Sequence, residues 1–156
     1  MKKSILILFL FSIVAQAQYT KAVVYMKNGT QKEGLAKMVF SNNAKVNFKK
    51  DENSKNEKIA TLDIKKIIYT NEGQTIITME PFYLITPSIL TNKFSKSEKK
   101  YWSCIVYDKK QKIGRIDDKG DKRNNNYRAV SSSYYFGTSE SEELVFGYIT
   151  TGSLVK

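Results

Sequence analysis

Carboxylates, lysines and tyrosines are the side chains of this sequence that could do chemistry, because the chain contains no histidine. The lack of histidine excludes Ser-His-Asp and Cys-His catalysis as well as histidine-based metal sites. Asp63, Glu72 and Glu80 could serve as the acid and base of a glycoside hydrolase, whose two carboxylates stand about 5 to 9 Å apart. Carboxylates on a basic protein are more often solvated or ion-paired. We therefore predict no catalytic residue and keep a small carboxylate hydrolase as an alternative function.

Two short segments match known site motifs in part. Residues 97–100, Ser-Glu-Lys-Lys, satisfy the Ser-x-x-Lys pattern of penicillin-binding enzymes, but the Lys-Thr-Gly element of those enzymes is absent. Asp117, Asp118 and Asp121 lack the spacing of a calcium-binding EF-hand loop and stand among lysines and arginines that oppose a divalent ion. We therefore predict no metal site and no cofactor, and a charged loop over residues 117–126.

The residues that we single out for binding lie in residues 93–128, where aromatic and basic side chains are interleaved. A strand there would place Tyr101 and Tyr107 on one face and Trp102 on the other face, which we expect to be core. Tyrosines beside cations can bind glycans or anionic polymers through ring contacts and charge. The predicted binding surface consists of Tyr101, Tyr107, Lys109, Lys110, Lys112 and Arg115.

The charge of the chain is concentrated in the same segment. The full chain has a formal net charge of +11, and residues 93–128 carry 12 Lys and Arg against 5 Asp and Glu. Such a segment attracts anionic polymers such as those of a cell envelope. The alternative is that these lysines only keep the protein soluble.

The N-terminus has the pattern of a secretory signal peptide over residues 1–17. Lys2 and Lys3 precede an apolar run of about ten residues, too short for the roughly 20 that span a bilayer, and Ala15-Gln16-Ala17 matches a cleavage site. An uncleaved anchor is the alternative. We expect cleavage near Ala17, a periplasmic or extracellular chain, and no transmembrane segment after cleavage. Cys104 is the single cysteine, so we expect a buried thiol and no internal disulfide.

The elements that must position these residues are mostly strands in the first half of the chain. Residues 19–26 and 44–49 have the composition and alternation of strands, and Asn28-Gly29 is typical of a hairpin turn. Residues 63–67 are consistent with one helical turn, and Pro81 should end the strand that begins at residue 74.

The end of the chain carries helix signals. Ser139-x-x-Glu142 matches a capping box, and Leu144, Val145, Tyr148 and Ile149 would share one helical face. Residues 127–136 are expected to form a short helix before it.

The predicted fold class is therefore α+β, in one domain over residues 18–156. A mainly antiparallel bent sheet or small barrel covers residues 18–80. A strand pair with basic loops covers residues 81–126, and a short helical part covers residues 127–156.

A family resemblance rests on three segments of the first half. They are Val23-x-Tyr25-Met26-Lys27-Asn28-Gly29-Thr30, Glu33-Gly34-Leu35 and Asp63-Ile64-x-x-Ile67. The arrangement resembles the opening barrel of small secreted proteins of unassigned function from Bacteroidetes-type bacteria, and in outline it is similar to SH3-like and Sm-like small barrels. The resemblance implies a fold and carries no catalytic residues, and a fold does not assign a function.

The sequence thus predicts an exported, non-enzymatic envelope or extracellular protein that binds an anionic polymer or a glycan through its basic and tyrosine-rich surface. The alternatives are the carboxylate hydrolase and a passive subunit that contacts another envelope protein. A passive subunit would expose an apolar patch larger than a few hundred Å².

Overall fold

The structure is a computed structural model that describes residues 19–88, 93–119 and 129–153. Within these residues the chain forms strands and one short 3-10 helix, and it contains no α-helix. The predicted signal peptide lies outside the described residues, so its export function stays a prediction. The elements are β1 (Tyr19–Met26), β2 (Gln31–Lys37), β3 (Lys45–Lys49), β4 (Glu57–Ala60), η2 (Thr61–Asp63), β5 (Ile64–Asn71), β6 (Gln74–Pro87), β7 (Phe94–Lys96), β8 (Tyr101–Asp108), β9 (Gln111–Lys119), β10 (Ala129–Thr138) and β11 (Glu143–Ser153).

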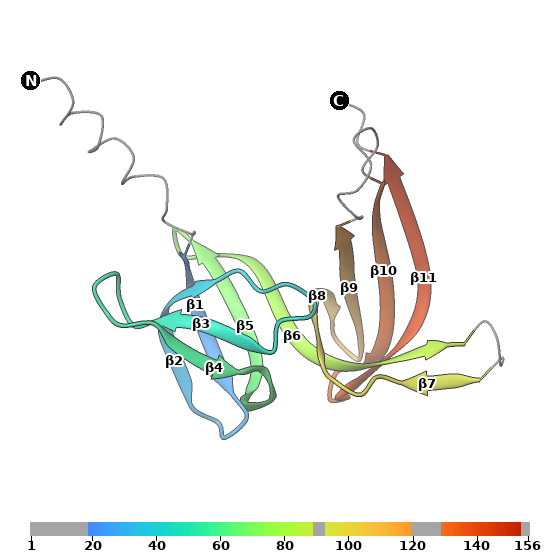
Figure 1. Cartoon of the computed structure of the whole chain (residues 1–156), viewed down its shortest axis with the longest axis horizontal. Coiled ribbons are helices and arrows are strands. Elements are labelled where there is room, and N and C mark those ends of the chain that lie inside the picture. The colour runs from blue at the N-terminus through green and yellow to red at the C-terminus, as the bar shows by residue number, and fades with distance from the viewer. Residues whose placement is uncertain (1–18, 89–92, 120–128, 154–156) are drawn as a thin grey trace, which may run out of the picture.

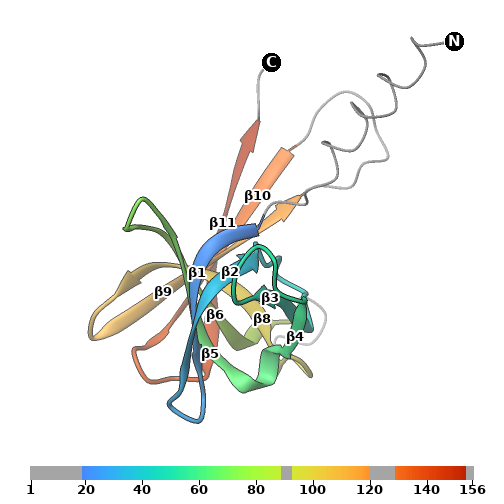
Figure 2. The ribbon, with the colours of Figure 1, turned by 90° about the vertical axis from the view of Figure 1, so that its left-hand side faces the viewer.

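The strands pair in the order β11-β10-β9-β8-β6-β5-β1-β2-β3-β4, with β7 on the side of β6. Strands β1 to β5 curl into a strongly bent sheet, which we call the first lobe (Figure 2). In the second lobe, which comprises β6 to β11, β11 also pairs in parallel with β6, where Glu143–Val145 lie opposite Tyr83–Ile85. This pairing closes β6, β8, β9, β10 and β11 into a ring of five strands, which we call the second barrel (Figure 1).

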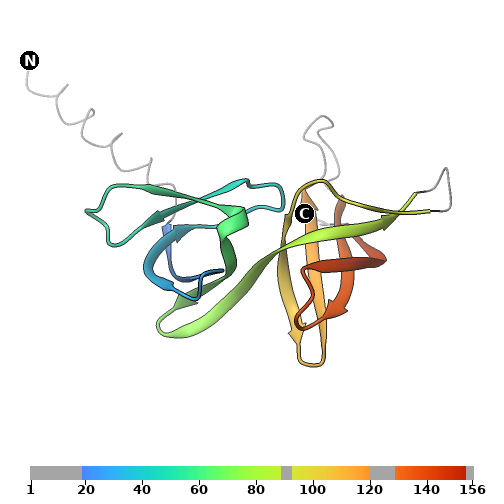
Figure 3. The ribbon, with the colours of Figure 1, turned by 90° about the horizontal axis from the view of Figure 1, so that it is seen from below.

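Strand β6 belongs to both lobes and runs from one into the other (Figure 3). Successive side chains of a strand point to opposite faces, and β6 uses this alternation to serve two cores. Met79 packs in the first core, whereas Phe82 and Leu84 pack in the second core with Tyr135 and Leu144.

Trp102 of β8 fastens the second lobe to the first. Its side chain is only 1% exposed and lies in the first core, among residues of the first lobe such as Val46 and Ile64. The indole Nε1 donates to the carbonyl oxygen of Asn43 and to Thr61 Oγ1, each at 3.1 Å. The backbone nitrogen of Trp102 donates to the carbonyl oxygen of Ser41 at 2.8 Å. The sequence expectation that Trp102 is core is therefore confirmed.

The α+β prediction is wrong, because the C-terminal part is strand rather than helix. The sequence predicts helix over residues 127–136 and 144–149, but residues 129–136 and 144–149 lie in the antiparallel hairpin of β10 and β11. Residues 127 and 128 lie outside the described residues. The β-branched and aromatic residues of β10 and β11 favour a pleated, half-buried surface, and cross-strand pairing outweighs the capping signal. Of the four apolar residues expected on one helical face, only Leu144 is buried, whereas Val145, Tyr148 and Ile149 are exposed. The register of the hairpin shifts between Tyr134 and Tyr135.

Three smaller expectations are also corrected. Pro81 does not end a strand, because β6 continues to Pro87 and Pro81 lies opposite Trp102 of β8. Most of the helical turn expected over residues 63–67 is strand, because β5 begins at Ile64. The 3-10 helix η2 ends at Asp63, directly before that strand. The predicted hairpin at Asn28-Gly29 is confirmed, with Gly29 at a φ of 86° between the antiparallel strands β1 and β2.

No helix formed by the described residues is both long and apolar enough to cross a membrane.

We expect Trp102→Ala to lower the free energy of unfolding by about 3 to 5 kcal/mol, because a large buried side chain leaves a cavity between the lobes. Urea denaturation followed by circular dichroism measures this loss. Tyr107→Ala, in the exposed part of the same strand, is the matched control and should cost less than about 1 kcal/mol. Equal losses in the two variants would contradict the role given to Trp102.

Candidate functional site

The second barrel contains a cavity of about 400 Å³ on the side that faces the first lobe. Its wall comes from β6, β8, β9 and β10, together with the segment after β7 and the loop between β2 and β3. Ligand sites commonly have volumes of about 300 to 1,000 Å³, so the cavity is large enough for a small ligand. The lining residues are Ser41, Leu84, Thr86, Ser97, Tyr101, Ile116, Asp117, Ser133 and Tyr135.

Leu144 of β11 fills the barrel next to this cavity, and two glycines make room for it. A Cβ atom at Gly114 of β9 would lie 2.7 Å from Leu144 Cδ1, and one at Gly137 of β10 would lie 2.7 Å from Leu144 Cδ2. Both distances are well below ordinary van der Waals contact. The glycines therefore let Leu144 pack at 0% exposure, and the space beyond it is left to polar side chains.

Hydroxyl groups dominate the polar lining of the cavity. Within the described part of the chain, the side-chain hydroxyls of Ser41, Thr86 and Tyr101 make no hydrogen bond to protein. Ser97 differs, because its Oγ accepts from the Leu84 amide at 2.9 Å and donates to the Lys99 carbonyl at 2.8 Å. Ser97, the serine of the Ser-x-x-Lys motif, thus links the backbone of Leu84 to that of Lys99. The three hydroxyls named above have no such role.

Tyr135 is the most buried hydroxyl-bearing side chain of the cavity wall. Burial raises the pKa of its phenol, the nearby Tyr101 phenol raises it further, and hydrogen bonding with Ser133 acts in the opposite direction. Tyr101, Ser133 and Tyr135 therefore form one group of hydroxyls from two strands.

A buried ion pair lies within the second barrel. Lys112 Nζ lies 2.6 Å from Glu80 Oε2, and both side chains are more than nine-tenths buried. Lys112 Nζ also lies 5.3 Å from the centre of the Phe82 ring. Lys112 was predicted to belong to the binding surface, but the structure places it inside the barrel.

The predicted surface residues do not gather at one place. Tyr101 lines the cavity, whereas Tyr107 is exposed farther along β8 and Lys109 and Lys110 lie in the turn between β8 and β9. Arg115 Nε lies 3.0 Å from Asp117 Oδ1. Of the predicted set, only Tyr101 is among the residues that line the cavity.

The three carboxylates of the hydrolase alternative are also apart. Asp63 ends η2, and Glu72 lies in the turn between β5 and β6 with a φ of 49°. Glu80 is eight residues from Glu72, a span of roughly 20 Å or more along an extended strand, and it is bound to Lys112. Glu72 and Glu80 are therefore too far apart to act across one sugar, and the hydrolase alternative stays a prediction.

The calcium-loop motif falls partly outside the described residues. Asp117 and Asp118 lie in β9, so the expected loop over residues 117–126 is wrong at its start, and residues 120–126 lie outside the described residues. Asp117 Oδ1 accepts a hydrogen bond from Ser132 Oγ at 2.7 Å. The residues that the structure describes contain no cluster of metal-ligating side chains.

Sequence reasoning missed most of the cavity. Ser133 and Tyr135 lie in the segment predicted as helix, and Thr86 lies in the part of β6 beyond Pro81, where that strand was predicted to end. The alternation of Ser131, Ser133 and Tyr135 was a usable strand signal, since a small polar residue two positions from a tyrosine fits one face of a sheet.

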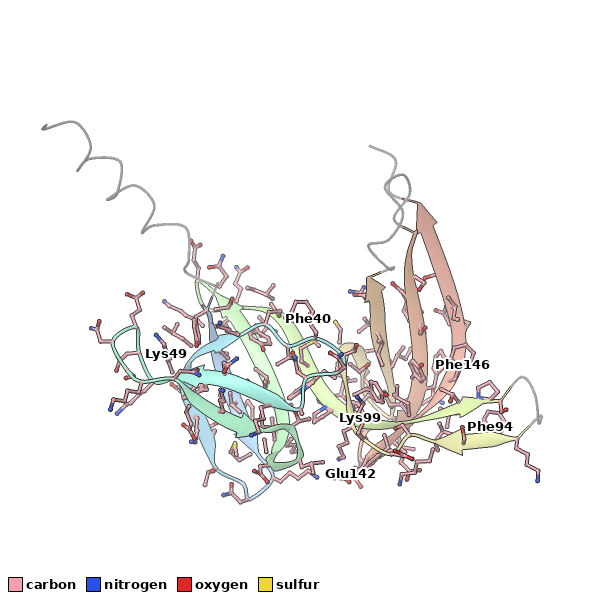
Figure 4. All side chains as sticks on the ribbon, in the orientation of Figure 1. Phe40, Lys49, Phe94, Lys99, Glu142 and Phe146 are labelled. Atoms are coloured by element: carbon pink, nitrogen blue, oxygen red, sulfur yellow. The ribbon has the colours of Figure 1, made fainter. Side chains whose placement is uncertain are left out.

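Glu142 joins the two lobes at the surface. Its carboxylate contacts Lys27 Nζ at 2.9 Å and Lys100 Nζ at 3.2 Å. Lys27 follows β1 of the first lobe, and Lys100 precedes β8 with its side chain only 3% exposed. Hydrogen bonding to Lys27 and Lys100 lowers the pKa of Glu142. Figure 4 shows Glu142 and Lys99 near the junction of the lobes.

No known family model, curated protein or solved structure matches this chain. The resemblance to small secreted barrel proteins stays a prediction.

We expect Lys112→Met to lower the free energy of unfolding by about 3 to 5 kcal/mol, because it leaves the Glu80 carboxylate buried without its cation. The double variant Lys112→Met/Glu80→Leu should recover most of that loss, since no charge is then buried. Urea denaturation measures both. A double variant no more stable than the single one would contradict this account.

Stability should fall in acid through Glu142. Its pKa is lower in the folded chain than in the unfolded chain, so its contribution is complete above the usual carboxyl pKa and is lost as pH falls through the folded-state value. Glu142→Gln should cost up to about 1 kcal/mol at pH 7, and this cost should shrink between pH 5 and pH 3. Urea denaturation across these pH values tests it, with Glu140→Gln in the same turn as control. A cost that stays constant with pH would contradict the role of the carboxylate charge.

Proposed function

We propose that this chain is an exported, non-enzymatic binding protein that holds a glycan segment in the cavity of its second barrel. The observation that carries the proposal is the convergence of hydroxyl side chains on that cavity, three of which the fold itself does not use.

The chemistry of the lining suits a sugar. Serine, threonine and tyrosine hydroxyls both donate and accept hydrogen bonds, as the hydroxyls of a sugar do. Tyr101 and Tyr135 add ring surface that can contact the C–H groups of a sugar, and Leu84 and Ile116 extend that apolar area. A ligand with these two kinds of surface would satisfy the wall without leaving polar groups unpaired.

The cavity is less suited to a ligand that must bury a charge. Burial of a charged group is costly unless an opposite charge meets it. The buried cation of the barrel, Lys112, is already bound to Glu80, and Asp117 at the cavity is bound to Arg115 and Ser132. A neutral, hydroxyl-rich group therefore fits the interior better than a phosphate or a carboxylate.

The non-enzymatic part of the proposal is supported by the residues near the cavity. The chain has no histidine, and the carboxylates Glu80 and Asp117 are each held by a cation. Export is supported by the signal-peptide pattern of residues 1–17.

The assembly-subunit alternative has weaker support. Exposed large apolar side chains are scattered over β6, β7, β8, β11 and the segments after β2 and β4, as with Ile76, Phe94 and Ile149. Apolar residues dispersed in this way are normal on a protein surface.

We expect Tyr101→Phe and Thr86→Val each to weaken glycan binding by about threefold to tenfold, the equivalent of one hydrogen bond, because these hydroxyls line the cavity and make no hydrogen bond within the described residues. Isothermal titration calorimetry of the purified full chain, with a panel of neutral and acidic trisaccharides, measures the affinity. Tyr148→Phe is the matched control, because Tyr148 stacks on Tyr134 at 4.8 Å and does not line the cavity. Binding of no trisaccharide, or equal weakening by the control, would overturn the proposal.

A further inference from the structure

We propose that the glycan held by the cavity is acidic and that Lys99 binds its carboxylate at the mouth of the site. This inference rests on the proposed function and names the class of sugar that the site would select.

Lys99 is placed at the cavity by its contact with Tyr101. The Lys99 ammonium lies 5.3 Å from the centre of the Tyr101 ring, and Tyr101 is part of the cavity wall. The Lys99 backbone is fixed as well, because its carbonyl accepts the hydrogen bond from Ser97 Oγ. A lysine held at both ends of its side chain in this way presents its charge at one position beside the cavity.

Lys99 differs from the lysines around it in having no carboxylate partner. Lys96 binds Glu143 at 2.5 Å, and Lys100 binds Glu142 at 3.2 Å. Among the described residues, Lys99 makes no ion pair, and its side chain is exposed. The charges of Lys96 and Lys100 are therefore paired within the fold, whereas the charge of Lys99 is available to a ligand.

The position of Lys99 also keeps the cost of desolvating the sugar carboxylate low. A carboxylate bound at the mouth keeps part of its hydration, whereas the uncharged ring of the same sugar enters among the hydroxyls of Thr86, Ser133 and Tyr135. On the wall of the cavity, the negative charge of Asp117 is offset by Arg115. The site thus has a neutral interior and one cation at its entrance. This arrangement is complementary to a uronic acid, which has an uncharged ring and one carboxylate.

The test compares each acidic sugar with its own neutral form. The probes are trimers of uronic acids in the gluco, galacto and manno configurations, together with their methyl esters, titrated calorimetrically into the purified full chain. Esterification removes the charge and keeps the ring hydroxyls. We expect at least one acid to bind roughly three- to tenfold more tightly than its ester, as one charge-assisted contact predicts, and this preference should shrink as salt is raised.

Lys99→Gln should remove the preference for the acid and leave the affinity for the ester unchanged. Lys93→Gln is the matched control, because it changes the net charge equally but lies just before β7 and is not among the residues that line the cavity; it should keep the preference. Binding of acid and ester with equal affinity would overturn this inference while the proposed function stands. Binding of no sugar in either form would overturn the proposed function itself, and the inference with it.

Discussion

The placement of the two lobes depends on one buried contact, the insertion of Trp102 from β8 into the core of the first lobe. A single strand, β6, connects the lobes covalently and shares its two faces between them. A shared strand alone leaves the lobes able to twist about it. The indole removes that freedom, because its ring is packed among residues of the first lobe and its nitrogen is bound to Asn43 and Thr61.

The shape of the cavity depends on this contact. Ser41 belongs to the loop between β2 and β3, and its carbonyl receives the backbone hydrogen bond of Trp102. The next residue but one, Asn43, receives the indole. The loop of the first lobe is thereby held against the wall of the second barrel, so that residues from β2–β3 and from β10 line one space. The same arrangement explains why the site could not be seen as a motif, since its members come from six separate parts of the chain.

The features that the sequence predicted correctly are those set by residues close together in the chain. The hairpin at Asn28-Gly29 needs only a turn with positive φ, and the burial of Trp102 follows from its alternation with Tyr101. The errors arose where distant contacts decide the structure. The Ser139-x-x-Glu142 motif matches a helix capping box, yet the Glu142 carboxylate forms ion pairs with Lys27 and Lys100, which lie elsewhere in the chain. Lys112 looked like a surface cation because nothing local shows that Glu80, thirty-two residues earlier, lies inside the same barrel.

The parallel pairing of β11 with β6 has a consequence for how the protein acquires its site. Residues 143–145 must find residues 83–85, and contacts between segments so far apart in the chain are slow to form because the intervening loop has to be closed first. The hairpins of the first lobe are local and can form early, from residues that are synthesised first. The second barrel closes only when β11 pairs with β6, so the barrel that contains the cavity is completed late in folding. A chain truncated before residue 143 would carry the hydroxyls of the cavity wall without the β11–β6 pairing and without Leu144 beside them.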